Sequence, residues 1–212
     1  MAIDPKSGHR IGKAEIYSRL SKLTKATATQ EDIDEHIARL KAESDRGVMI
    51  LAATMLDDAL RVALMRTMPT ASKNVKDQIF THDGPMGTFS KRILLAEGIG
   101  MFSPAVARQV HVIRRIRNAA AHAHADVSFA VEEVKQALAT VLDNDQADDF
   151  ETWPAKKVRN FYLQLCGYIA DHLIAGNKGL VAGAESPEAI HAFYRAINAS
   201  DLTEDDEGAV LA

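Results

Sequence analysis

Apolar side chains recur at spacings of three and four residues along much of the chain, and the pattern is clearest between Asp45 and Met68. This spacing places apolar groups on one face of a helix, as expected for a stripe that is buried against neighbouring helices. Pro69 disfavours helical backbone in the residue before it and ends the predicted helix. The positions of the stripe are Met49, Ala52, Ala53, Leu56, Leu60 and Leu64, and Ile50 widens it.

The same spacing, together with capping residues, predicts helices along the rest of the chain. One helix is expected to begin near Thr29, a second to cover 75–80, and a third to run from Thr88 to Gly98. A fourth begins at Ser103-Pro104 and frays near 121–124. The last three are expected over 129–142 behind a Ser128 cap, over 155–174 behind Pro154, and after Pro187. No segment alternates polar and apolar residues as a strand does. The sequence therefore predicts an all-α, multi-helix bundle in a single domain.

The polar ends of the chain differ from its centre. Residues 1–28 are expected to form a flexible basic arm, with one short helix near 13–23, and residues 199–212 an acidic tail. The helical domain is predicted to cover 29–198, with a charged loop at 144–149. Such opposite charges permit either a local anionic partner or an internal contact with the tail, and both readings stay open.

Composition supports a chain that folds without a cofactor or a disulfide. Hydrophobic residues make up 47% of the 212 residues and charged residues 25%. A chain of this size buries roughly 70% of its unfolded surface. The one cysteine, Cys166, lies in an apolar run and is expected to be an inert buried thiol. No leader peptide or membrane-length apolar run is found, so we expect a cytoplasmic protein with no membrane partner.

Candidate chemistry centres on the segment 114–124, which lies in an acid-free stretch from 98 to 125. Arg117 can fix a phosphate, His122 can exchange a proton near neutral pH, and Asn118 can orient either one. Residues five apart on a helix lie about 140° apart around its axis, so Arg117 and His122 meet only if the helix ends early or a second subunit completes the site. We therefore expect a homodimer. The candidate binding residues are Arg114, Arg115, Arg117 and His124.

The same side chains also have a purely structural interpretation. Arg117 can pair with Asp57 or Asp58, which lie on an otherwise apolar helix and need partners. His122 can cap a helix C-terminus, where a cation is favourable. No metal is expected at His122-x-His124-x-Asp126, because residues two apart point away from each other on a helix. The net charge of −4 and the absence of a recognisable DNA-binding motif argue against a general nucleic-acid binder.

Four separate blocks occur in an order that resembles the mannitol operon repressor family, over about residues 40–145. They are Asp45-Arg46-Gly47, Leu56-Asp57-Asp58-Ala59-Leu60, Gly84 to Arg92, and Ile113 to His122. This resemblance implies an all-helical transcriptional regulator without a familiar DNA-binding motif, acting through protein partners or indirectly on DNA. The helices expected in 146–198 are additions to the family-like core.

The block Arg117-Asn118-Ala119-Ala120-Ala121-His122 is also similar to the hallmark of the HEPN superfamily. That similarity implies the alternative function, a metal-independent ribonuclease of the toxin or defence type. In it Arg117 contacts the phosphate, Asn118 supports it, and His122 acts as acid and base. The expected function is thus a non-enzymatic regulator, with an RNA-cleaving enzyme as the alternative.

Overall fold

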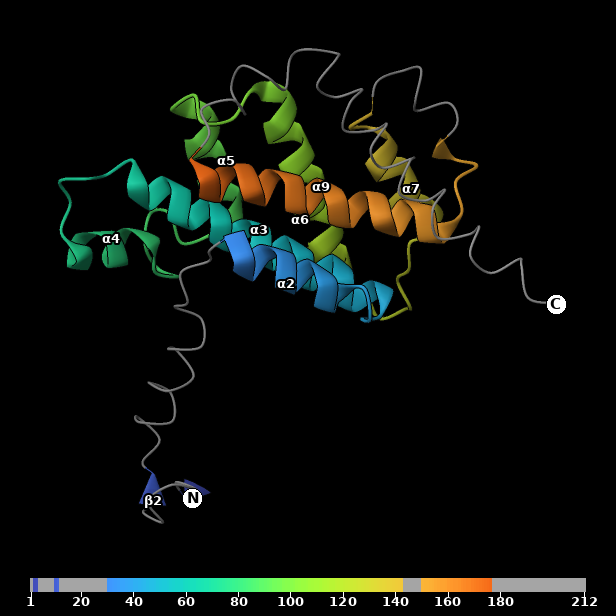
Figure 1. The fold of residues 1–212 in the computed structure, drawn as a ribbon, viewed down its shortest axis with the longest axis horizontal. Helices are drawn as coiled ribbons and strands as arrows, with labels where there is room; N and C mark the ends of the chain where they lie inside the picture. Colours follow the sequence, from blue (N-terminus) through green and yellow to red (C-terminus); the bar gives the residue numbers. More distant parts are fainter. Residues whose placement is uncertain (1, 4–9, 12–29, 143–149, 177–212) are drawn as a thin grey trace.

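The computed structural model describes residues 2–3, 10–11, 30–142 and 150–176, and residues 30–142 and 150–176 form an all-α bundle. Figure 1 labels the helices of this part of the chain. They are α2 (Gln30–Leu40), α3 (Asp45–Arg66), α4 (Lys73–Phe80), α5 (Phe89–Gly98), α6 (Pro104–His122), α7 (Glu132–Ala139) and α9 (Ala155–Ala175). Two short strands, β1 (Ala2–Ile3) and β2 (Arg10–Ile11), pair antiparallel ahead of them. The predicted all-α class is confirmed.

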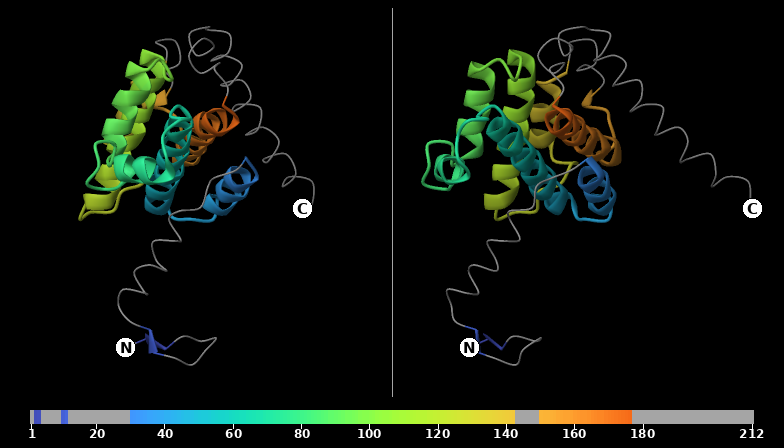
Figure 2. Two further views of the ribbon diagram at one scale, coloured as in Figure 1. Left: turned by 90° about the vertical axis from the view of Figure 1, so that its left-hand side faces the viewer. Right: turned by 60° about the vertical axis from the view of Figure 1, so that its left-hand side comes forward.

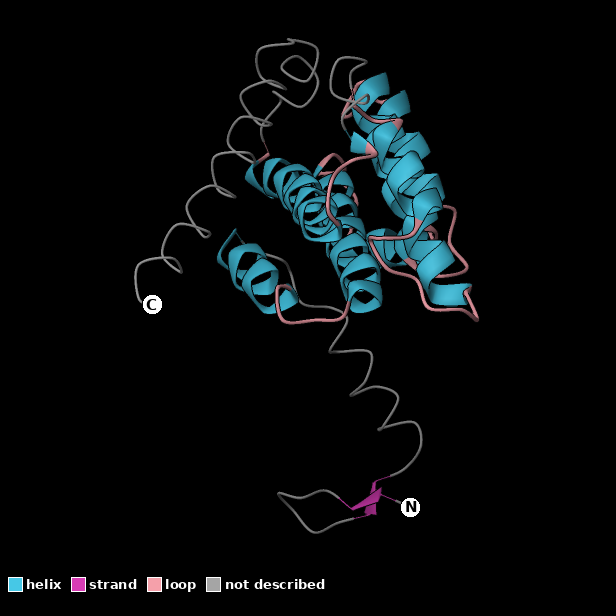
Figure 3. Ribbon diagram, turned by 90° about the vertical axis from the view of Figure 1, so that its right-hand side faces the viewer, coloured by secondary structure: helices cyan, strands magenta, loops and turns pink. Residues whose placement is uncertain are grey.

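Helix α3 forms the centre of the bundle. Helices α9 and α2 pack against it on one side, while α6 and α5 pack against it on another (Figures 1 and 2). Figure 3 shows the same helices after a 90° turn from Figure 1, from the side opposite to the left view of Figure 2. The central position of α3 explains why the strongest apolar pattern in the sequence falls in 45–68, because a helix with neighbours on several sides needs a wide buried surface.

Local sequence explains where α3 begins and ends. The Ser44 side chain accepts a hydrogen bond from the Gly47 amide at 3.1 Å and caps the first turn. Asp45 follows in that turn, where a negative charge is favourable. The helix ends at Arg66, just ahead of the predicted stop at Pro69. Leu56, Leu60 and Leu64 are fully buried on its inner face, and each contributes about 1.5–3 kcal/mol. Both predicted ends are therefore correct within two residues.

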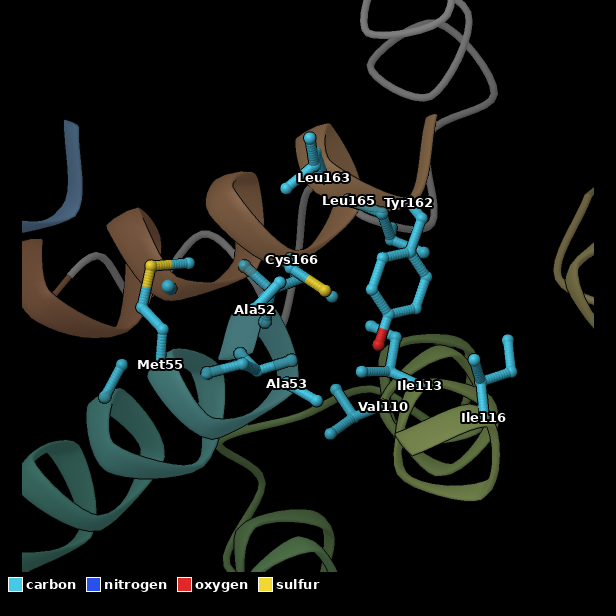
Figure 4. Close-up of a cluster of buried hydrophobic side chains, with 14 of the residues drawn as sticks. Ala52, Ala53, Met55, Val110, Ile113, Ile116, Tyr162, Leu163, Leu165 and Cys166 are labelled. Atoms are coloured by element: carbon cyan, nitrogen blue, oxygen red, sulfur yellow. The ribbon is translucent and has the colours of Figure 1, made fainter. Parts of the chain in front are cut away.

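The Tyr162 hydroxyl and the Cys166 thiol are polar groups in the core between α3, α6 and α9. Figure 4 shows Tyr162 and Cys166 of α9 among Ala52 and Ala53 of α3 and Ile113 of α6. The Tyr162 hydroxyl donates to the Met49 carbonyl at 2.9 Å, so this buried polar group is satisfied. Burial raises the pKa of the Cys166 thiol, as expected for an inert cysteine. The predicted burial of Cys166 is confirmed.

The predicted helix over 129–142 is wrong at both ends. Helix α7 covers only Glu132–Ala139, and its N-cap residue Val131 makes no side-chain capping bond. Instead the Phe129 amide donates to the Asp45 carboxylate at 3.0 Å, and the fully buried Phe129 ring anchors this segment in the core. This tertiary contact takes the residues after Ser128 out of helical backbone, which local capping rules cannot predict.

Other predicted boundaries agree with the structure. Thr88 caps α5, and Ser103 caps α6 with Pro104 at its first turn. Helix α9 begins after Pro154, as expected. The short helix predicted near 13–23, the loop at 144–149, the helix after Pro187 and the acidic tail lie outside the described residues.

Candidate functional site

Helix α6 carries every residue of the Arg-Asn-x-x-x-His block, and it is regular to its end. The Ser103 hydroxyl accepts from the Val106 amide at 3.3 Å at the N-terminus. At the other end the Ala123 amide donates to the Ala119 carbonyl at 2.8 Å, so the helix continues through His122. Arg117 and His122 consequently lie about 140° apart around one unbroken helix. Within one chain the two side chains therefore leave the helix in different directions.

The cations of α6 divide between two sides of the helix. Arg108, Arg115 and His122 are all exposed and are spaced seven residues apart. Seven residues fall only about 20° short of two full turns, so these three side chains follow one line along the helix. No acidic residue lies in α6. We call Arg108, Arg115 and His122 the open face of α6.

Arg114 and Arg117 lie on the other side and are only partly exposed. The Arg117 Nη1 donates to the Asn118 Oδ1 at 3.1 Å. The charge of Arg117 acts to lower the pKa of both Asp57 and Tyr162, although desolvation dominates and raises each of these pKa values. Arg117 therefore lies near the helix interface. The Nε of Arg114 is buried and has no hydrogen-bond partner within the described residues.

The C-terminus of α6 is capped from another helix. The Arg46 Nη2 donates to the Ala123 carbonyl at 3.0 Å. His122 lies in the last turn of α6, the position that its structural interpretation predicts, and Arg46 supplies the hydrogen bond to the cap residue. His124 follows the helix and is exposed.

Asp57 pairs with Arg92 of α5 rather than with Arg117. Arg92 is 7% exposed, and its guanidinium also donates to the Met86 carbonyl at 2.9 Å and the Gly87 carbonyl at 3.2 Å. Desolvation raises the pKa of Asp57, and the attraction of Arg92 opposes that rise. A single guanidinium therefore joins α3, α5 and the turn before α5.

That turn explains two glycines of the third sequence block. A Cβ on Gly84 would lie 2.3 Å from the Gln78 carbonyl oxygen, and a Cβ on Gly87 would lie 2.2 Å from the His82 carbonyl oxygen. The turn folds back closely onto the end of α4, and only glycine fits there. Sequence reasoning missed that Arg92 joins this turn to Asp57, although an acid on an apolar helix indicated that a buried cation was needed.

The first block is also structural. The Asp45 carboxylate accepts from the Phe129 amide and pairs with Arg159 of α9. Arg159 further donates to the Leu40 carbonyl at 3.1 Å, which closes the end of α2. All four blocks of the family resemblance therefore supply contacts that hold the helices around α3.

The described residues contain no group of three or more histidine, cysteine, aspartate or glutamate side chains placed to hold a metal ion. None of the helices in the described ranges is both long enough and apolar enough to cross a membrane. Comparisons with protein-family models, with curated proteins and with solved structures each found no match.

Proposed function

We propose that this protein is a non-enzymatic regulator of the mannitol operon repressor type, which acts by binding an acidic protein partner. The observation that carries the proposal is the division of the α6 cations. Arg108, Arg115 and His122 form an open face, whereas Arg117 lies on another side of the helix and is partly buried. The side chains that a phosphodiester-cleaving site requires are separated, while those that can dock a partner are aligned.

The shape of the open face favours a protein partner over a nucleic acid. From Arg108 to His122 it extends about 21 Å along one helix as a single row of cations. Acids repeated every seven residues on a partner helix match such a row, in the way that charged edges pair in coiled coils. The net charge of −4 would oppose non-specific association with a polyanion elsewhere on the molecule.

Fluorescence anisotropy with labelled polyglutamate, single-stranded RNA and duplex DNA tests the proposal at low and physiological ionic strength. Polyglutamate should bind most tightly. The Arg108→Glu/Arg115→Glu variant should lose at least about tenfold in affinity, because attraction becomes repulsion. The matched control is Lys41→Glu/Lys156→Glu, which reverses two exposed lysines outside α6 and should bind normally. Tighter binding to DNA or RNA, or equal losses in both variants, contradicts a protein-binding open face.

The alternative proposal is a metal-independent ribonuclease of the HEPN type. The observation in its favour is the hydrogen bond from Arg117 to Asn118, since it matches the supporting role that the resemblance gives to the asparagine. His122 of a second copy would have to approach Arg117, so this function requires a homodimer. Sedimentation velocity tests whether the protein is a dimer. A monomer at assay concentrations would leave Arg117 and His122 about 140° apart around one helix, and the ribonuclease alternative would then be rejected.

A further inference from the structure

A groove lies between the C-terminal half of α3 and the first turns of α4, which Figure 1 shows side by side. Its volume is about 580 Å³, within the range of about 300–1,000 Å³ that is typical of small-molecule sites. Its lining residues are Arg61, Val62, Met65, Arg66, Lys73, Lys76 and Asp77. None belongs to α6, so the groove is separate from the open face.

The groove is strongly cationic. Four of its lining side chains are positive and one, Asp77, is negative, whereas the whole chain has a net charge of −4. Cations gathered in one concavity raise the local positive potential and attract anions. This excess of positive charge indicates an anionic ligand.

Both arginines already have partners: Arg66 is held by the end of α9, and Arg61 by neighbours on α3 itself. The Arg66 Nη1 donates to the Leu173 carbonyl at 3.3 Å and also to the Ile174 carbonyl, at the end of α9. Arg61 lies 3.7 Å from the Asp58 carboxylate, and its Nη1 lies 3.9 Å from the Met65 sulfur. Side chains ordered before binding lose less entropy when a ligand arrives.

The two lysines lie opposite, in the first turn of α4. In the described part of the chain, neither Lys73 nor Lys76 has an ion-pair partner, and no acid lies in that first turn. A lysine at a helix N-terminus is unfavourable, because the unpaired amides already carry partial positive charge there. An anion in the groove would neutralise both the lysines and the helix end.

We propose that this groove binds an organic polyphosphate, of which a nucleoside diphosphate is the representative class. The lysines and arginines would contact the phosphates, since ammonium and guanidinium groups make charge-assisted hydrogen bonds to phosphate oxygens. Val62 and Met65 give the same groove an apolar wall, and a thioether packs well against an aromatic ring. A bare inorganic anion would leave that wall unused.

Isothermal titration calorimetry of the full chain with ADP, pyrophosphate and adenosine tests the site. ADP should bind most tightly, pyrophosphate at least about tenfold more weakly, and adenosine weakest, because the wall and the cations each contribute part of the free energy. No heat with ADP at low ionic strength overturns the proposal. Pyrophosphate binding as tightly as ADP rejects the organic part of the ligand, and adenosine binding as tightly as ADP rejects the role of the cations.

The Lys73→Glu/Lys76→Glu variant should lose ADP affinity at least about tenfold, and the loss should shrink as salt is added. Loss of fold is not a competing explanation, because an acid in the first turn of α4 is favourable for the helix. The Lys73→Gln/Lys76→Gln variant, which removes the charges without reversing them, should show a smaller loss. Lys41→Glu/Lys156→Glu is the control, and an equal loss of ADP binding in that variant contradicts the assigned site.

Discussion

Replacing Arg92 by methionine tests whether one guanidinium joins α3, α5 and the turn before α5. The substitution keeps the length and much of the apolar stem of the side chain, but it removes the ion pair with Asp57 and the bonds to the Met86 and Gly87 carbonyls. Breaking a buried pair while leaving one charge behind costs about 3–5 kcal/mol. We therefore expect Arg92→Met to lower the free energy of unfolding by that amount at pH 7.

The loss should depend on pH in a direction set by Asp57. Its carboxyl already has a raised pKa because of desolvation, and loss of Arg92 raises that pKa further. A native pKa above the unfolded value means that the folded state binds the proton more tightly. The free-energy cost of the unpaired Asp57 charge is complete above the native pKa, and it is relieved as the pH falls below that pKa and the carboxyl takes up a proton. Arg92→Met should therefore lose less stability at pH 4, close to the unfolded pKa of about 3.9, than at pH 7.

Urea unfolding monitored by circular dichroism at the two pH values measures both effects. The Asp57→Asn/Arg92→Met double variant should recover part of the loss at pH 7, because it removes the unpaired charge. Asp58→Asn is the matched control, since Asp58 lies next in the helix, is more exposed and lies 3.7 Å from Arg61. A loss below about 1 kcal/mol for Arg92→Met, or one that is equal at both pH values, would refute the reasoning.

Three further predictions concern the backbone and the core. Gly84→Ala should lower the free energy of unfolding in urea by about 1–3 kcal/mol or more, because its Cβ would lie 2.3 Å from the Gln78 carbonyl oxygen. Gly98→Ala is the control: its Cβ would meet nothing within 4 Å, so it should change stability by less than about 0.5 kcal/mol. Equal effects would argue against the close turn. Arg46→Met should speed hydrogen exchange in the last turn of α6, because the carbonyl after that helix loses its donor, and unchanged exchange there would count against this cap. The buried Cys166 thiol has a raised pKa and should react with Ellman's reagent only after unfolding in urea; rapid reaction of the native protein would contradict its burial.

Local patterns in the sequence predict most of the helices well, but they predict poorly the helix ends that tertiary contacts determine. Periodicity and capping residues place α3, α5, α6 and α9 within two residues, because each has its own apolar stripe and its own end signals. The late start of α7 follows from the Asp45 side chain, which lies 84 residues from Phe129. No local rule contains that contact.

In the candidate site, too, local geometry could be predicted from the sequence, whereas contacts between helices could not. Helical geometry alone indicates that Arg117 and His122 cannot meet on a regular helix, and the unbroken α6 agrees. Which cation pairs with Asp57, and which one caps α6, depends on how helices pack across the bundle. Lys73 and Lys76 showed no pattern in the sequence, because the groove they line exists only once α3 and α4 lie together.

The most direct test of the central claim is RNA cleavage in the presence of EDTA. Labelled single-stranded RNA is incubated with the wild type and with the Arg117→Ala and His122→Ala variants, and the products are separated on a denaturing gel. A binding protein whose Arg117 and His122 remain apart should leave the RNA intact in all three reactions. Cleavage by the wild type that both variants abolish would contradict the regulatory account and establish the ribonuclease.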